Sequence, residues 1–108
     1  MRPLDAFPMQ ARRLVKGVLT DIDDTLTMTR LLLAECFAVD LDAEKGSFVF
    51  VGDSPNDAPM FAFFPHAVGT ANVRDVEDRM PATPAYVTER PAGAGFAELA
   101  AALLEARG

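Results

Sequence analysis

The chain has 108 residues, half of them apolar, so it has the length of one domain and can bury a core. Acidic residues outnumber basic ones by 16 to 10, which argues against a general nucleic-acid or anionic-membrane surface. Cys36 is the only cysteine, so an internal disulfide and a multi-cysteine zinc site are excluded. The apolar runs are far shorter than the roughly 20 residues that span a bilayer, and the first residues lack a signal-peptide pattern. We therefore expect a cytoplasmic protein with no nucleic-acid or membrane partner.

The first half of the chain predicts an irregular start followed by a strand, a helix and a second strand. Pro3 and Pro8 disfavour regular structure at the beginning. The expected elements are a lead-in over 1–14 with room for a short helix near 9–14, a strand over 15–20, a helix over 28–39 and a strand over 47–52.

The second half continues the alternation of helix and strand. Asp57 is a suitable N-cap for a short helix, and Pro59 is tolerated in its first turn. The expected elements after that helix are a strand over 66–69, a helix over 74–80, a strand over 86–87 and an alanine-rich helix over 95–107. This alternation predicts one α/β domain over residues 1–108, a Rossmann-like parallel sheet of about four strands with flanking helices.

Two acidic loops follow the first two expected strands. "DIDDT" comes directly after the first strand, and "GDSPND" comes directly after the second. If a right-handed crossover joins these strands as neighbours, Asp21 and Asp23 face Asp53 and Asp57 at the carboxyl edge of the sheet. Four carboxylates this close repel one another unless a cation lies among them, and Mg²⁺ prefers such oxygen ligands.

The same loops resemble the signatures of a known family. "DIDDT" is similar to the DxDxT signature, and "GDSPND" to the GDxxxD signature, of the haloacid dehalogenase-like hydrolases, most of which are Mg²⁺-dependent phosphatases. The stretch from 66 to 104 is similar to the end of Cof-type and sugar-phosphate phosphatases. Together the resemblance covers residues 15–27 and 46–104.

The resemblance implies a role for each matching residue. Asp21 would be the nucleophile that takes the phosphoryl group, and Asp23 the general acid and base. Asp53 would bind Mg²⁺ together with Asp21 and the backbone carbonyl of Asp23, and Asp57 would support the metal site. The loop residues that would line this site are Ser54 and Asn56. The implied substrate is a small phosphorylated metabolite.

The chemistry is consistent with these roles independently. A carboxylate attacks phosphorus only where the phosphate charge is neutralised, and a second carboxyl must protonate the leaving oxygen and then deprotonate water. Two aspartates at i and i+2 of an extended segment project on the same side. The simpler alternative is that both loops are ordinary Asx-rich turns before helices.

Other residues have a simpler interpretation. His66 is predicted to be a histidine at a strand edge rather than a catalytic base. Arg12 and Arg13 are predicted to form a solvated patch, and Cys36 a buried thiol. The phenylalanines at 61, 63 and 64 are predicted to pack in the core.

The chain also departs from the family pattern. Members carry two further strands, a phosphate-binding Ser or Thr, a cap domain and a phosphate-binding Lys between the two signatures, which here are only about 30 residues apart. Lys16 and Lys45 lie too far back along the expected strands to reach a phosphate. Thr25 or Thr27 is the best substitute for the missing hydroxyl, and Arg30 for the missing cation. The result is a shortened half-core with weakened activity.

Three classes of function remain open on the sequence. The first is a Mg²⁺-dependent phosphohydrolase core, and the second is a catalytically silent module that retains metal binding or self-assembles. The third is a receiver-like signalling domain, which would need a lysine after a late strand; the loops after residues 69 and 87 contain none.

The shortened sheet also predicts self-association. The strand over 15–20 would lack one of the neighbours it has in the family, which leaves an edge that can pair with a second copy in a two-fold dimer. The alternative is that residues 1–14 fold back over this edge, covering it with Leu4, Phe7 and Met9.

Overall fold

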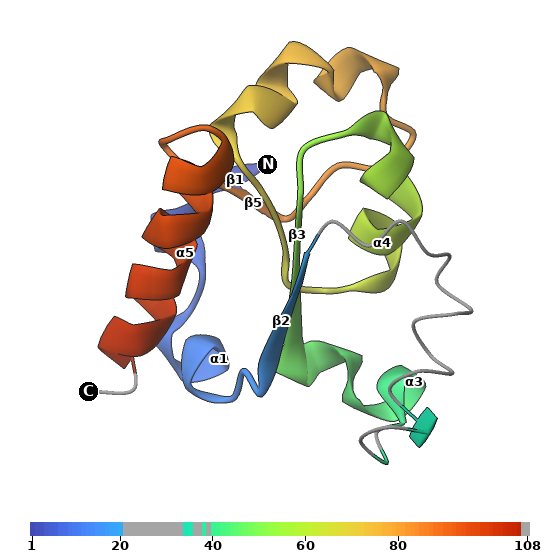
Figure 1. Ribbon diagram of the computed structural model, residues 1–108, viewed down its shortest axis with the longest axis vertical. Helices are drawn as coiled ribbons and strands as arrows, with labels where there is room; N and C mark the ends of the chain where they lie inside the picture. The colour runs from blue at the N-terminus through green and yellow to red at the C-terminus, as the bar shows by residue number, and fades with distance from the viewer. Residues whose placement is uncertain (21–33, 36–37, 39, 107–108) are drawn as a thin grey trace.

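The computed structural model describes residues 1–20, 34–35, 38 and 40–106. It contains one parallel sheet of five strands in the order β1-β5-β4-β3-β2 (Figure 1). The strands are β1 (Arg2–Pro3), β2 (Gly17–Thr20), β3 (Phe48–Gly52), β4 (Ala67–Gly69) and β5 (Tyr86–Val87). The expected α/β, Rossmann-like fold is confirmed, with five strands in place of about four.

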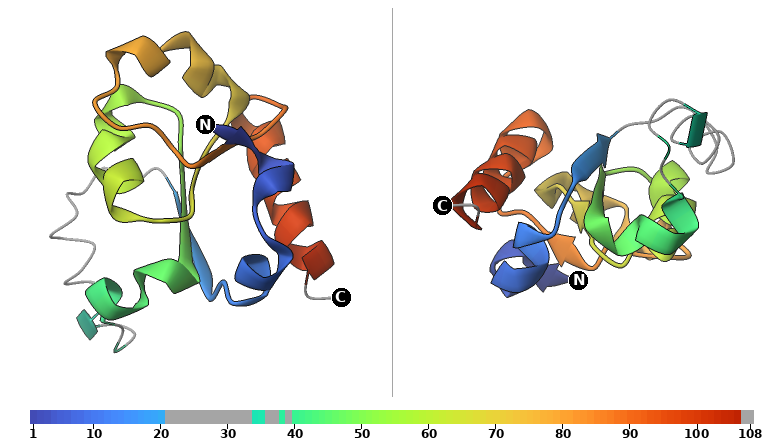
Figure 2. Two further views of the ribbon diagram at one scale, coloured as in Figure 1. Left: turned by 180° about the vertical axis from the view of Figure 1, so that it is seen from behind. Right: turned by 90° about the horizontal axis from the view of Figure 1, so that it is seen from below.

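Helices cover both faces of the sheet. The α-helices described in full are α1 (Met9–Arg13), α3 (Leu41–Glu44), α4 (Ala58–Phe63) and α5 (Ala92–Ala106). Helices α1 and α5 lie on one face and α4 on the other, which the end-on view of Figure 2 shows as three layers. In the described part of the chain, none of the helices is long and apolar enough to cross a membrane.

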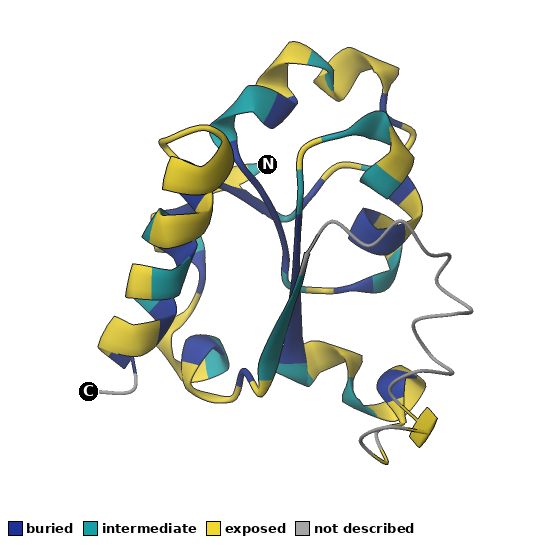
Figure 3. Ribbon diagram, in the orientation of Figure 1, coloured by how far each residue is buried: buried dark blue, intermediate teal, exposed yellow. Residues whose placement is uncertain are grey.

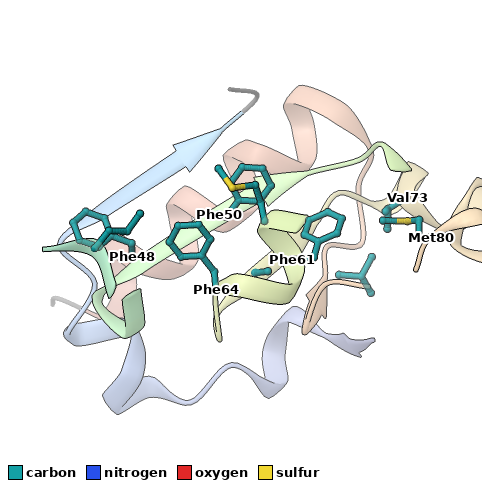
Figure 4. Packing of buried hydrophobic residues seen from close by; sticks show 10 residues of the cluster. Phe48, Phe50, Phe61, Phe64, Val73 and Met80 are labelled. Atoms are coloured by element: carbon teal, nitrogen blue, oxygen red, sulfur yellow. The ribbon is translucent and has the colours of Figure 1, made fainter. Parts of the chain in front are cut away.

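The core consists of two clusters, one on each face, separated by β3. Successive side chains of a strand point to opposite faces, so Phe48 and Phe50 enter one cluster while Val49 and Val51 enter the other. All four side chains are buried, as Figure 3 shows for this strand. The first cluster holds the aromatic contacts of β3 with α4, and its labelled members in Figure 4 are Phe48, Phe50, Phe61, Phe64, Val73 and Met80. The predicted core role is confirmed for Phe61 and Phe64, while Phe63 is half-buried.

The short helix predicted near 9–14 is confirmed as α1, but the residues before it were wrongly expected to be irregular. Residues 2–3 form β1, which pairs with the outer edge of β5. Pro3 has no backbone N–H to donate, and an edge strand tolerates this because no further strand needs that hydrogen bond. Leu4 and Phe7 are buried in the cluster under α5. The segment thus covers a face of the sheet and the edge of β5. It does not lie along β2, which ends the strand order on the other side.

Arg12 was also wrongly assigned to a solvated patch. Its side chain is buried and donates from Nη2 to the carbonyl of Leu4 at 3.1 Å, and its guanidinium lies 5.7 Å from the Phe7 ring centre. Arg13 is exposed, as expected, and donates from Nε to the carbonyl of Ala106 at 3.0 Å, which satisfies an end carbonyl of α5. The two arginines therefore fix the N-terminal segment and the end of α5.

Several elements differ from the sequence prediction, including β2, which begins at Gly17, and the unpredicted helix α3. The helix expected over 74–80 is replaced by two 3₁₀ helices, η4 (Ala71–Asp75) and η5 (Glu77–Arg79). Helix α5 begins at Ala92, three residues earlier than expected. Of the helix expected over 28–39, Ala34 and Glu35 are helical, but Ala38 has a φ of 54°, so a right-handed helix does not continue through it. The rest of that helix, including Cys36, lies outside the described residues.

His66 lies just before β4, at the amino edge of the sheet, which confirms its predicted place at a strand edge. Its ring stacks on Phe7 with 4.9 Å between ring centres, and its Nδ1 is buried without a hydrogen-bond partner in the described part of the chain. Burial lowers the pKa of His66 below the ordinary value of 6.5.

We predict that this histidine makes the protein less stable as the pH falls. Because the pKa of His66 is lower in the folded state, the unfolded state binds the proton first as the pH falls. The contribution of neutral His66 to the free energy of unfolding is therefore full above pH 6.5 and lost as the pH falls below it. The His66→Phe variant retains a ring against Phe7 and removes the titration. Urea unfolding between about pH 7.5 and 5.5 should show a smaller loss of stability in the variant than in the parent. Equal losses would contradict this explanation.

Candidate functional site

The loop after β3 is a compact turn held by a capping box. Ser54 is the N-cap of the 3₁₀ helix η3 (Pro55–Asp57), and its Oγ accepts from the backbone N–H of Asn56 at 3.2 Å. The Oδ2 of Asp57 accepts from the backbone N–H groups of Asp53 and Ser54, both at 3.1 Å. Asp57 occupies the predicted N-cap position of α4, although its side chain makes no capping bond to that helix. Ser54 caps η3 instead, and Asp57 closes the box from its third position.

Gly52 is required by this turn. A Cβ at position 52 would lie 2.5 Å from Oδ2 and 2.7 Å from Cγ of Asp57. Any side chain at position 52 would push the Asp57 carboxylate away from the two amides that it accepts from. The glycine of "GDSPND" thus has a local physical cause, which is the close approach of the Asp57 carboxylate to the end of β3.

A second set of hydrogen bonds fixes Asp53 from the neighbouring loop. Asn72, in η4 after β4, donates from Nδ2 to Oδ2 of Asp53 at 2.9 Å. The Oδ1 of Asn72 accepts from the hydroxyl of Thr70 at 2.7 Å and from the backbone N–H of Ala92 at 3.0 Å. Three segments therefore meet at Asp53: the loop after β3, the loop after β4 and the start of α5.

A pocket of about 330 Å³ opens where these segments meet. Figure 1 shows η4 and the start of α5 gathered beyond the carboxyl ends of β3 and β4, where loops of a parallel sheet converge. Phe96 of α5 is partly exposed at this pocket. The lining residues are Val51, Gly52, Asp53, Asp57, Thr70, Ala92, Gly93 and Phe96.

The pairing of β2 with β3 matches the arrangement expected from the sequence. The two strands are parallel neighbours, with Thr20 opposite Val51 and Gly17 opposite Phe48. The end of β2 therefore lies beside the end of β3, and "DIDDT" follows Thr20 in the sequence.

The site residues predicted from the sequence fall into two groups. Four lie together in the loop after β3, namely Asp53, Ser54, Asn56 and Asp57. The other four lie outside the described residues, namely Asp21, Asp23, Thr25 and Arg30. Within the described ranges, no three His, Cys, Asp or Glu side chains are grouped to hold a metal ion. Asp53 and Asp57 are the described carboxylates that line the pocket, so a metal centre would need further ligands, which the sequence prediction assigns to the DIDDT segment.

Both lysines lie away from this edge, as the sequence predicted. Lys16 forms an ion pair with Glu44, and its backbone N–H donates to the carbonyl of Ser47 at the amino ends of β2 and β3. The Nζ of Lys45 lies 5.1 Å from the centre of the Phe63 ring. Neither lysine contributes to the pocket at the carboxyl ends.

Sequence reasoning assigned no role to Asn72, Thr70 or Phe96. The available signal was positional, because "TAN" directly follows a strand and carries two polar side chains to the same edge as "GDSPND". Phe96 lay inside an alanine-rich segment whose helical start could not be located from periodicity alone.

Comparison with protein-family models, with curated proteins and with solved structures finds no match to this chain. The chemistry of the site is therefore judged from its own residues.

We predict that Mg²⁺ raises the melting temperature through Asp53. A cation that binds only the folded state stabilises it by about 1.4 kcal/mol when its concentration is about tenfold above the dissociation constant. Scanning calorimetry should show this stabilisation in the parent and not in Asp53→Asn. Asp5→Asn is the matched control, because Asp5 is exposed in η1 (Leu4–Ala6), which follows β1 at the opposite end of the strand order from β2 and β3. Equal stabilisation of the Asp53→Asn variant would exclude Asp53 as a ligand.

Proposed function

We propose that this chain is a Mg²⁺-dependent phosphomonoester hydrolase core of the haloacid dehalogenase-like superfamily, acting on a small phosphorylated metabolite through an aspartyl-phosphate. The single observation that supports it most is the parallel register of β2 and β3, with Thr20 opposite Val51. This register places Thr20, the residue before the DIDDT segment, beside the end of the strand that leads into the loop with Asp53.

The proposed reaction has two steps. A carboxylate oxygen of Asp21 forms a bond to phosphorus while the ester P–O bond breaks, and Asp23 gives its proton to the leaving oxygen. Asp23 then takes a proton from a water molecule, whose oxygen attacks phosphorus and breaks the bond to Asp21, releasing phosphate. Asp53, with Asp21 and the backbone carbonyl of Asp23, would hold Mg²⁺, which neutralises the charge on the phosphate when bound.

The remaining residues have supporting roles in this proposal. Asp57 holds the loop through the amides of Asp53 and Ser54, so it positions Asp53 through the backbone. Ser54 and Asn56 lie in the same loop, and Thr25 and Arg30 are proposed as the substitutes for the phosphate-binding hydroxyl and cation.

We expect activity to be weak. The two lysines are at the other edge of the sheet, and the pocket is lined by Asp53 and Asp57 with no basic side chain from the described part of the chain. Loss of one transition-state donor costs about 3 kcal/mol in other enzymes. Preorganised charge provides most of the catalysis of phosphoryl transfer, so its loss should lower the rate strongly.

A catalytically silent module is the alternative, and the capping box favours it. The Oδ2 of Asp57 accepts from two backbone amides, so part of the GDxxxD signature has a purely structural use here. A receiver-like domain ranks third, because residues 70–73 and 88–91 offer no lysine at the carboxyl edge.

Slow, Mg²⁺-dependent hydrolysis of an activated aryl phosphate is the expected result, and Asp21→Asn should abolish it. An amide at position 21 cannot form the aspartyl-phosphate, whereas the exposed control Asp5→Asn should retain the parent rate. The measurement is release of the phenol with and without Mg²⁺. Turnover that survives in Asp21→Asn would contradict the mechanism, and no turnover in the parent would favour the silent module.

The proposed partner, besides the substrate, is a second copy of the chain. β2 ends the strand order, and its four residues include no proline or charge that would block pairing at its outer side. Val18 and Leu19 are only half-buried, although they pack against the two clusters. Light scattering should therefore give a mass above that of one chain, and a concentration-independent mass near 11.6 kDa would exclude the dimer.

A further inference from the structure

We propose that Asn72 is a positioning residue that fixes the carboxylate of Asp53 for cation binding. This proposal rests on the proposed function, because it concerns the residue assigned there as a Mg²⁺ ligand. It adds a residue that is absent from both sequence signatures and lies 19 positions after Asp53.

The orientation of the Asn72 amide follows from its partners. A backbone N–H can only donate, so the Asn72 atom that meets the N–H of Ala92 at 3.0 Å must be the carbonyl Oδ1. The other atom is then Nδ2, which can only donate, and it faces Oδ2 of Asp53 at 2.9 Å. The reverse orientation would place two donors together at Ala92 and two acceptors together at Asp53.

The Asn72 amide is itself held by hydrogen bonds from Thr70 and Ala92. Thr70 is only 4% exposed, and its hydroxyl donates to Oδ1 of Asn72 at 2.7 Å. Ala92 has a φ of 49°, a left-handed conformation that costs a residue with a Cβ about 1 kcal/mol or more unless its surroundings impose it. The bond from its N–H to Asn72 is one contact that holds it there.

The consequence for Asp53 is a restrained carboxylate. The bond from Asn72 occupies a lone pair of Oδ2, while the Asp53 backbone N–H is bonded to Asp57. Both the backbone and the side chain of Asp53 are therefore restrained before any cation binds. Partners of this kind, which orient a ligand without touching the metal, typically change metal affinity 10- to 100-fold when they are removed.

The main test is Mg²⁺ binding to Asn72→Ala by titration calorimetry, with Gln10→Ala as the control for truncating an exposed amide in α1. We expect the dissociation constant to rise about 10- to 100-fold in Asn72→Ala and to stay unchanged in the control. The Mg²⁺ concentration for half-maximal hydrolysis should rise similarly, while kcat at saturating Mg²⁺ changes little. A loss of folding would lower kcat as well, so this split separates positioning from a structural role.

Thr70→Val provides a second variant in case Asn72→Ala does not fold. It removes the hydroxyl behind Asn72 and keeps the shape of the side chain, so a smaller loss of Mg²⁺ affinity is expected. Mg²⁺ binding by Asn72→Ala as tight as by the parent would overturn the proposal while the proposed function stands. If Asn72→Ala does not fold, equally tight binding by Thr70→Val and the parent would overturn it.

A spectroscopic measurement tests the contact without any metal. The side-chain NH₂ signal of Asn72 in ¹H–¹⁵N spectra should shift as Asp53 is protonated, and this shift should be absent in Asp53→Asn. Absence of the shift in the parent would overturn the proposal. If the shift is present but the parent does not bind Mg²⁺, the proposed function is contradicted. Asn72 would then remain the residue that orients Asp53.

Discussion

The parallel pairing of β2 with β3 is the constraint on which the candidate site depends. Thr20 lies opposite Val51, so the two strands end at the same edge. A shift by one residue would move Val18 and Leu19 to the opposite faces of the sheet, where each would meet the wrong cluster. The register of β2 and β3 therefore determines which loops lie side by side and can cooperate chemically.

The loop after β3 is organised by hydrogen bonds to its own backbone and to the loop after β4. Gly52 admits the Asp57 carboxylate, Asp57 binds two amides, and Asn72 orients the Asp53 side chain. Electrostatic catalysis depends on groups that need not reorganise during reaction, and these bonds provide such order at Asp53. The same order would serve a silent metal-binding module equally well, so function depends on what the DIDDT segment contributes.

Strong periodicity and turn chemistry made much of the fold predictable. The run from 47 to 52, apolar on both faces, gave a buried central strand, and the alanine- and leucine-rich C-terminus gave α5. The first residues were not predictable, because β1 is two residues long and is formed by pairing with β5, 84 positions later in the register Arg2 to Tyr86. The burial of Arg12 was missed for a related reason. It depends on contacts with the carbonyl of Leu4 and the ring of Phe7, which no local sequence pattern indicates.

The candidate site was predictable to the extent that it uses contiguous motifs. Asp53, Ser54, Asn56 and Asp57 lie together because one turn contains them. Asn72 and Ala92 reach the same place through tertiary structure, and their roles follow from donor and acceptor chemistry that only coordinates show. The residues from 21 to 33 lie outside the described part of the chain, so the predicted roles of Asp21, Asp23, Thr25 and Arg30 remain predictions.

In the proposed site, the carboxylates after β2 and β3 share one cation. Titration with Mn²⁺ in place of Mg²⁺ tests this sharing, because a paramagnetic ion broadens the amide signals of the residues around it. We expect substoichiometric Mn²⁺ to broaden the signals of residues 21–24 and 52–57 together, and added Mg²⁺ to restore both sets. Broadening of 52–57 without 21–24, or broadening spread over exposed acidic residues such as Glu77 and Asp78, would contradict a shared site.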